Sequence, residues 1–265
     1  MARDGFVPVE DGELFYARDG DGPAVVLAHG APIVDHRQWD AQVGPLAERH
    51  TIVRYDLRGY GRSSVPTDRA YRHCDDLAAL ITGLGFDHAV VGGESYGAMV
   101  ALDTTLTYPD LVDALILDAA VPVTGWEWAE ELPVAPALRL ARTETLDVIK
   151  EAFVQLPMFA AAREQPAVLH ELRTMAADYE GWHFGHRDPA EWAAERATDR
   201  LGEISVPTLV VSGGRDVLDV RLIADMLADA IPNASHVVVE NAGHLPEMED
   251  SGAFNTAVLD FLEHL

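Results

Sequence analysis

A serine stands in the segment Gly93-Glu94-Ser95-Tyr96-Gly97, which fits the pattern Gly-x-Ser-x-Gly. The segment follows an apolar run, residues 88–92, that predicts a strand, and it opens a predicted helix over residues 96–107. Small residues two positions on either side of the serine allow a tight, strained turn that presents the hydroxyl at the end of the strand. The chemistry expected of Ser95 is nucleophilic attack on a carbonyl carbon, with the helix N-terminus favouring the negative charge that develops.

A nucleophilic serine needs a base, because its hydroxyl is unreactive at neutral pH. Of the 11 histidines, His244 is the best placed, since it lies just after the last predicted strand, residues 236–240. The acid that orients this histidine is predicted to be Asp216, which follows the predicted strand 208–211 and completes the chain order serine, acid, histidine. Asp118, at the end of an earlier strand, is the competing candidate; the loop position favours Asp216.

The negative oxygen formed by such an attack needs hydrogen-bond donors that are already in place. One predicted donor is the backbone N–H of Tyr96, immediately after the nucleophile. The other is the N–H of Ala31, in the loop His29-Gly30-Ala31-Pro32 that follows the predicted strand 24–28. Pro32 has no N–H to donate, and its fixed φ stiffens the turn. We therefore predict an oxyanion hole formed by Ala31 and Tyr96.

Three other residues have types that could do chemistry, but their context favours simpler roles. Cys74 is the single cysteine, and isolated cysteines are usually inert packing residues. Glu94 is interpreted as a surface carboxylate near a helix start. Asp219 is interpreted as a helix N-terminal residue favoured by capping.

Strands and helices alternate along most of the chain, which predicts an α/β fold with a mostly parallel, doubly wound sheet covered on both faces. A hairpin over residues 6–18, around Asp11-Gly12, precedes this alternation. Further strands are predicted over residues 24–28, 51–55, 88–92, 114–117, 208–211 and 236–240, and helices over residues 38–49, 74–84, 96–107, 220–230 and 252–264.

The stretch from Pro122 to Ser205 breaks the alternation, because it has helical patterns and many aromatic residues but no clear strand. An insertion of this length is too long for a plain loop. We therefore predict an inserted helical cap, residues 122–204, over one end of a core formed by residues 1–121 and 205–265.

Several residues of the predicted cap are candidates for contact with a substrate or a metal. An aromatic wall for substrate is predicted from Trp126, Trp128, Trp182 and His183. The His-x-x-His spacing of His183 and His186 could suggest a metal, but a site would need a further ligand that nothing nearby supplies convincingly. We predict no metal site.

Composition narrows the classes of protein and of partner. The 265 residues suffice for one large α/β domain, and 48% of them are hydrophobic, as expected of a globular protein. A formal net charge of −25 argues against nucleic acid as a partner. No run of 18 apolar residues predicts a membrane span, and the N-terminus lacks the pattern of a secretory signal. With one cysteine, the chain is expected to be cytoplasmic.

The motifs form an ordered series: His29-Gly30-x-Pro32, then residues 55–64 (YDLRGYGRSS), Gly93-x-Ser95-x-Gly97, Gly214-x-Asp216 and Gly243-His244. This series resembles the α/β-hydrolase superfamily, in the branch of small bacterial esterases, enol-lactone hydrolases, cofactor-free haloperoxidases and C–C bond hydrolases. The resemblance spans almost the whole chain except the cap. Epoxide hydrolases and haloalkane dehalogenases of the same superfamily carry Asp at the position of Ser95, so alkyl displacement is disfavoured.

The sequence therefore predicts a serine hydrolase that cleaves a small to medium, partly apolar ester or lactone through an acyl-enzyme on Ser95, without a cofactor. The first alternative is hydrolysis of a C–C bond in a β-diketone or dienoic acid by the same triad. The second is a ligand receptor on this fold, against which the intact triad argues. The expected partner is the small-molecule substrate, with no nucleic acid and no membrane. The natural substrate and the oligomeric state are left open.

Overall fold

The computed structural model describes residues 3–121, 123–129 and 131–265. Residue 122, where the predicted cap begins, lies outside this description, as do residues 1–2 of the N-terminus. Within it the chain forms an eight-stranded sheet of order β1-β2-β4-β3-β5-β6-β7-β8. In chain order the strands are β1 (Arg3–Val9), β2 (Gly12–Asp19), β3 (Ala24–Ala28), β4 (Thr51–Tyr55), β5 (Ala89–Glu94), β6 (Val112–Asp118), β7 (Thr208–Gly213) and β8 (Ala234–Val239).

Most neighbouring strands are parallel, as predicted. The hairpin of β1 and β2 is antiparallel and pairs with β4, whereas every pair from β4 through β3, β5, β6 and β7 to β8 is parallel. Parallel strands end at the same edge of a sheet, and functional groups of such folds gather beyond the carboxyl ends. The loops after β3, β5, β7 and β8 are therefore brought to one edge.

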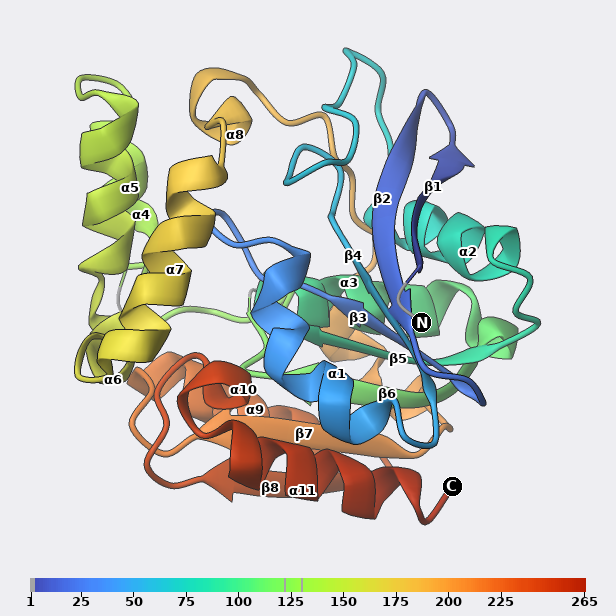
Figure 1. The fold of residues 1–265 in the computed structure, drawn as a ribbon. Helices are drawn as coiled ribbons and strands as arrows, with labels where there is room; N and C mark the ends of the chain where they lie inside the picture. Colours follow the sequence, from blue (N-terminus) through green and yellow to red (C-terminus); the bar gives the residue numbers. More distant parts are fainter. Residues whose placement is uncertain (1–2, 122, 130) are drawn as a thin grey trace.

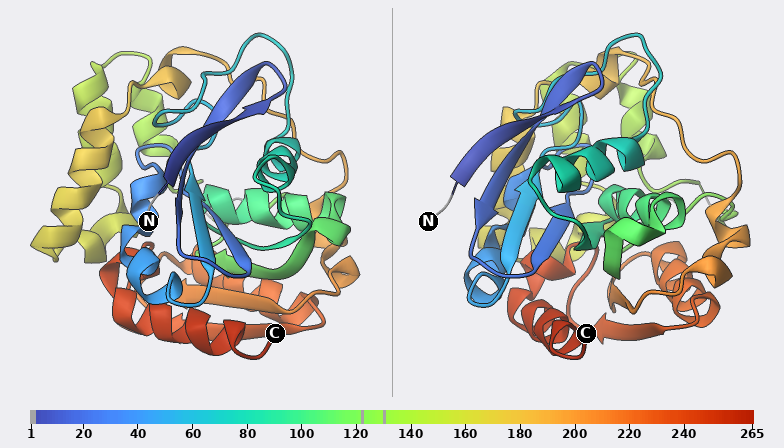
Figure 2. Two further views of the ribbon diagram at one scale, coloured as in Figure 1. Left: turned by 45° about the vertical axis from the view of Figure 1, so that its right-hand side comes forward. Right: turned by 90° about the vertical axis from the view of Figure 1, so that its right-hand side faces the viewer.

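Helices cover both faces of this sheet (Figure 2). Successive strand residues point to opposite faces, and in β3 Val26 belongs to one core while Val25 and Leu27 belong to the other. The sequences of central strands such as β3 are apolar throughout because both faces of the sheet are buried. One face carries α1 (Asp40–Leu46) and α11 (Ser251–Leu262), and the other carries α2 (His73–Gly83), α3 (Tyr96–Thr107) and α9 (Leu218–Ala230).

The helix predicted over residues 38–49 is shorter in the structure, and a different type of helix precedes it. A 3₁₀ turn, His36–Trp39, comes first, because the Asp35 side chain accepts a hydrogen bond from the backbone N–H of Arg37 at 2.9 Å. The α-helix α1 follows and ends at Leu46. A short helix, α10 (Pro246–Glu249), was not predicted.

Between β6 and β7 the described residues form helices and contribute no strand to the sheet. These helices gather on one side of the molecule (Figure 1). They are α4 (Ala135–Leu140), α5 (Leu146–Val154), α6 (Ala160–Arg163), α7 (Pro166–Asp178) and α8 (Trp182–Gly185). No helix in the described part of the chain is long and apolar enough to cross a bilayer.

Candidate active site

Ser95 sits in a sharp turn between β5 and α3. Its φ of 51° and ψ of −114° are strained for a residue with a side chain. A Cβ on Gly93 would clash with the backbone of Gly97, and a Cβ on Gly97 would clash with the carbonyl oxygen of Ala28. The two glycines are therefore needed for the turn to close against β3.

The structure brings Ser95, His244 and Asp216 into one hydrogen-bonded line. His244 Nε2 lies 3.1 Å from Ser95 Oγ, and His244 Nδ1 lies 2.7 Å from Asp216 Oδ2. All three side chains are buried. The other oxygen of Asp216 accepts a hydrogen bond from the N–H of Val217 at 2.6 Å, which fixes the carboxylate. Asp216, rather than the competing Asp118, is thus the acid that contacts His244.

His244 binds its proton more tightly than an ordinary histidine. Burial lowers its pKa, but Asp216, Glu94 and Glu247 raise it, with a net result of about 9. The imidazolium form is thus stabilised by carboxyl groups on several sides. Because the base must be unprotonated to accept the Ser95 proton, activity that depends on His244 will rise with pH.

The predicted oxyanion donors, Ala31 and Tyr96, belong to two segments that lie beside Ser95. Tyr96 is the first residue of α3, so its N–H has no acceptor within the helix. The loop that carries Ala31 is held beside Ser95: Gly30 donates its N–H to Gln38 Oε1 at 2.8 Å, and His29 Nε2 accepts from the N–H of Leu57 at 3.0 Å. A Cβ on Gly30 would lie 3.4 Å from Ser95 Cβ. The role of the two N–H groups remains a prediction.

Comparison with known proteins gives the family. A family model described as the Alpha/beta hydrolase family matches residues 25–257. The chain belongs to the α/β-hydrolase family. Among its relatives is a protein of Agrobacterium fabrum provisionally named carbamate hydrolase RutD, 30% identical, in an alignment that covers 94% of this chain and 97% of the relative.

Two solved structures resemble this α/β-hydrolase over nearly their full length. The enol-lactonase of Burkholderia xenovorans is 27% identical with a TM-score of 0.82, and the alignment covers 98% of this chain and 100% of that one. A thermophilic esterase of Thermogutta terrifontis is also 27% identical with a TM-score of 0.79, covering 99% of this chain and 98% of that one.

The interpretation of Glu94 as a surface carboxylate is wrong. Glu94 is 1% exposed, because it ends the buried strand β5 and faces the triad. Its Oε2 accepts a hydrogen bond from Gln38 Nε2 at 2.9 Å, and its Oε1 lies 3.4 Å from His244 Nε2. The same Gln38 amide donates to Glu247 Oε1 at 2.8 Å. Sequence reasoning missed Gln38 and Glu247; the position of Glu94 at the end of a buried strand was the available signal.

Asp219 lies at the N-terminal end of α9, as predicted, but its side chain does not cap the helix. It lies inside the first turn of that helix, and its Oδ1 accepts hydrogen bonds from Trp126 Nε1 and from the backbone N–H of Ala129, both at 3.1 Å. Trp126, a predicted substrate contact, thus ties the segment leading out of β6 to the core. Trp128 is half-buried and packs against the same core.

The other two predicted wall residues lie in α8. Trp182 stacks on His186, with ring centroids 5.1 Å apart. His183 stacks on Tyr60 at 4.3 Å, and its Nδ1 lies 2.7 Å from the Tyr179 hydroxyl. Substrate contact by these residues stays a prediction.

Three further residues, which were not predicted as site residues, contact His244 or Tyr96 through their rings. The ring of Phe159, between α5 and α6, meets His244 edge to face at 6.0 Å. Tyr96 meets Trp192 and His73 in the same way, at 5.3 and 5.5 Å. Burial lowers the pKa of His73 to about 3, so this histidine is neutral beside the Tyr96 ring. The helical insertion therefore contributes Phe159 and Trp192 to the walls of the site.

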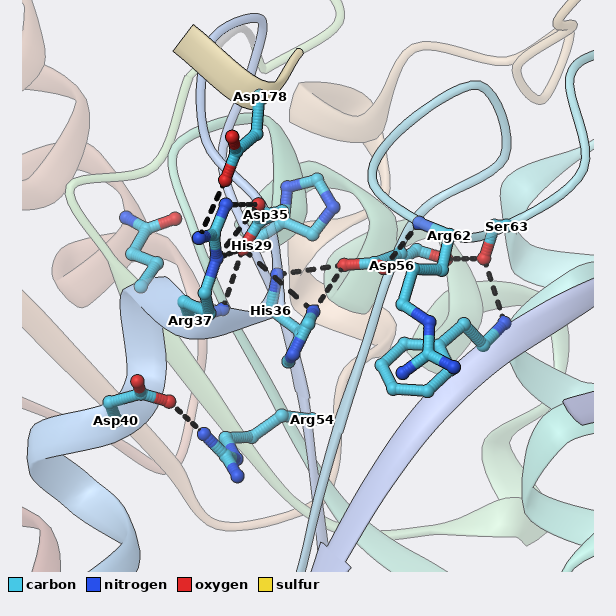
Figure 3. Close-up of polar contacts among 12 residues, drawn as sticks. His29, Asp35, His36, Arg37, Asp40, Arg54, Asp56, Arg62, Ser63 and Asp178 are labelled. Atoms are coloured by element: carbon cyan, nitrogen blue, oxygen red, sulfur yellow. Dashed lines mark hydrogen bonds and ion pairs between the residues drawn. The ribbon is translucent and has the colours of Figure 1, made fainter. Parts of the chain in front are cut away.

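A separate polar cluster lies near the start of α1 (Figure 3). Asp35, His36 and Asp56 place three possible metal-ligand atoms within 4.8 Å of one another. Their carboxylates already have partners: Arg37 binds Asp35 at 2.6 Å, and Asp56 lies 2.7 Å from His36 Nδ1 and accepts a hydrogen bond from the backbone N–H of Arg62 at 2.8 Å. A cavity of about 300 Å³ opens beside these residues. The cluster is explained by these contacts, and Arg37 also forms an ion pair with Asp178 of α7.

Cys74 is buried at the start of α2. Burial raises the pKa of its thiol, which disfavours the nucleophilic thiolate. The geometry agrees with a packing role.

Proposed function

We propose that this α/β-hydrolase is a serine hydrolase that cleaves a carboxylic ester or a lactone through an acyl-enzyme on Ser95. The observation that carries the proposal is the line of contacts from Ser95 Oγ through His244 to Asp216, set on a strained turn. A serine held in this way has a base within reach and an acid that fixes the tautomer of that base. A ligand receptor would need neither the base beside Ser95, nor the acid beside that base, nor the strained turn.

The proposed reaction has two halves that use the same groups. Ser95 Oγ attacks the substrate carbonyl carbon while His244 Nε2 takes its proton, and Asp216 stabilises the imidazolium. The N–H groups of Ala31 and Tyr96 hold the oxyanion. His244 then protonates the leaving oxygen, which departs. In the second half His244 takes a proton from a water molecule, which attacks the acyl carbon, and then returns that proton to Ser95 Oγ as the acid is released.

Similar proteins support an ester-type bond. The enol-lactonase and the thermophilic esterase, each 27% identical, are named for a lactone and for esters. A further structure, 26% identical with a TM-score of 0.79, is described as an enzyme that degrades N-acyl homoserine lactones. A lactone and an ester present the same carbonyl to Ser95 and differ in whether the leaving group stays attached.

A carbamate is the second candidate substrate. Several curated relatives that cover nearly the whole chain, 26 to 30% identical, carry the provisional name carbamate hydrolase. The nitrogen of a carbamate donates electrons to the carbonyl carbon, so attack is slower than on an ester. The same triad would form a carbamoyl-enzyme on Ser95, so the chemistry of the nucleophile is shared and the acyl group differs.

The test is hydrolysis of p-nitrophenyl butyrate, an enol-lactone and a p-nitrophenyl carbamate by the wild type and by Ser95→Ala, with intact-mass analysis. We expect ester or lactone turnover that disappears in the variant and an acyl adduct that maps to Ser95. Faster turnover of the carbamate than of both ester substrates would favour the second candidate. A folded wild type with neither turnover nor adduct on any substrate would overturn the proposal.

A further inference from the structure

A buried carboxyl oxygen with no hydrogen-bond partner faces the atom of His244 that must accept a proton. Within the described residues Glu94 Oε1 has no such partner, and it lies 3.4 Å from His244 Nε2. The same nitrogen is 3.1 Å from Ser95 Oγ. Leaving a buried carboxyl oxygen unpaired is costly unless a charge nearby compensates it. When His244 becomes imidazolium, the positive charge beside its Nε2 provides this compensation.

We propose that Glu94 is a positioning residue that acts through His244: its carboxylate stabilises the imidazolium from the Nε2 side, while Asp216 does so from the Nδ1 side. The inference rests on the proposed serine hydrolysis. When Ser95 gives up its proton, the O–H bond of Ser95 breaks and an N–H bond forms at Nε2. The positive charge therefore appears between two carboxylates rather than beside one.

The surroundings hold Glu94 in this position. Gln38 Nε2 donates a hydrogen bond to Glu94 Oε2, and Gln38 Oε1 accepts one from the backbone N–H of Gly30. Gln38 thus joins Glu94 to the loop that carries Ala31. A Cβ on Gly30 would clash with Glu94 Oε2, so this loop leaves room for the carboxyl group only because residue 30 is glycine. The carboxyl group is thus built into the wall of the site.

Charged groups from several elements face the pair. His244 is approached by Asp216 after β7 and by Glu247 of α10 as well as by Glu94. Asp118 of β6 adds to the charges around Glu94, and Glu249 of α10 adds to those around His244. Burial raises the pKa of Glu94 well above its ordinary value, and the neighbouring His244 opposes this shift only in part. Burial likewise raises the pKa of Glu247 to about 7.

Glu94 and His244 consequently titrate as a pair. A proton on His244 Nε2 leaves the site inactive, because this nitrogen must be free to accept the Ser95 proton. The His244 proton must leave before this residue can act as a base, and the nearby Glu94 carboxylate delays this loss to higher pH. Removing the Glu94 carboxyl should therefore move the onset of Ser95 reactivity to lower pH and weaken the base that remains.

The experiment measures the rate at which a fluorophosphonate labels Ser95 between pH 5 and 10. The probe needs only the nucleophile and its base, so it does not depend on the natural substrate. In Glu94→Gln we expect the acidic limb of the rate profile to move down by about 1–3 pH units, the range for removing a charge within 4–6 Å. The plateau at high pH should fall, because a weaker base takes the Ser95 proton less readily. Glu94→Asp, which keeps a carboxylate, should lie near the wild type.

Asp118→Asn is the matched control, since Asp118 is as buried as Glu94 and ends the neighbouring strand. Its acidic limb should lie closer to the wild type than that of Glu94→Gln. A Glu94→Gln limb that overlays the wild type would overturn the inference. If Glu94→Gln does not fold, NMR titration of the His244 ring in the wild type replaces it, and a midpoint at or below the ordinary value of about 6.5 would equally overturn the inference.

The two proposals fail in different ways. A wild type that is not labelled at any pH, or that is labelled equally after Ser95→Ala, contradicts the proposed serine chemistry. Labelling confined to Ser95 with an unmoved Glu94→Gln profile leaves that chemistry intact and removes the role of Glu94 alone.

Discussion

Asp216 follows β7, and Asp118 ends the neighbouring strand β6. Of these two carboxylates, Asp216 is the one that contacts His244. Asp216 Oδ2 lies 2.7 Å from His244 Nδ1. We expect Asp216→Asn to lower kcat for p-nitrophenyl butyrate by about 10⁴-fold, the loss known for the same change in a serine protease triad, because the amide favours the wrong tautomer. Asp118→Asn should keep most of the wild-type kcat. Steady-state kinetics of the two variants measures the difference, and a larger loss in Asp118→Asn would reverse the assignment.

Among single residues, the sequence indicated those whose place in the site follows from lying just after a strand. Ser95, Asp216 and His244 each follow a predicted strand, and parallel strands bring such positions together. Glu94 was misjudged because its environment depends on Gln38, 56 residues away in the chain, and on His244. No local pattern around Glu94 indicates that an amide from another segment will bury it.

At the scale of elements, the turn between β5 and α3 depends on Gly97. A Cβ at this position would clash with the carbonyl of Ala28 in β3. We expect Gly97→Ala to lower the free energy of unfolding by about 1–3 kcal/mol, as overpacking does, and to reduce Ser95 labelling. Thermal unfolding measures the loss, at about 2–4 °C per kcal/mol for a chain of this size.

The control for this prediction is Gly202→Ala. Gly202 lies in an exposed 3₁₀ turn, Leu201–Glu203, and a Cβ there would meet no atom within 4 Å. The change should leave the melting temperature equal or slightly higher, because alanine restricts the unfolded chain. Equal melting temperatures for the two variants would show that the turn can relax.

A second element, the segment leaving β6, is anchored to α9 by Asp219. The carboxylate accepts from Trp126 Nε1 and from the N–H of Ala129. Asp219→Ala leaves both donors without this acceptor, so we expect a loss of about 1–3 kcal/mol in unfolding free energy and faster proteolysis around Ala129. Asp225→Ala on the same helix, where the side chain is 65% exposed, should change stability by less than about 0.5 kcal/mol. Equal protease sensitivity in the two variants would contradict the anchor.

The sequence predicted the elements with long, regular patterns and missed those fixed by single contacts. Continuous apolar runs such as 24–28 and 208–211 have the pattern of strands buried on both faces, and the structure confirms them. The 3₁₀ turn at His36–Trp39 depends on hydrogen bonds that Asp35 accepts from the backbone N–H groups of Arg37 and Gln38, and α10 has four residues, too few for a helical period. Such elements are set by tertiary contacts rather than by periodicity.

For the whole molecule, the net charge of −25 acts on every approaching ligand. The field repels anionic substrates, and salt shortens its reach from about 30 Å at 0.01 M to about 3 Å at 1 M. We expect kcat/KM for an anionic p-nitrophenyl succinate half-ester, relative to neutral p-nitrophenyl butyrate, to rise by about tenfold over this range of NaCl, as expected when electrostatic repulsion limits encounter.

The neutral ester serves as the internal control, because salt effects on the triad itself cancel in the ratio. The carboxyl groups around His244 are buried and shielded from ions, so their influence on the base persists at high salt, whereas the field of the surface charges does not. A ratio that stays constant with salt would mean that the surface charges do not govern approach to Ser95. Discrimination against anions would then have to arise beside the triad, where Glu94 and Glu247 lie.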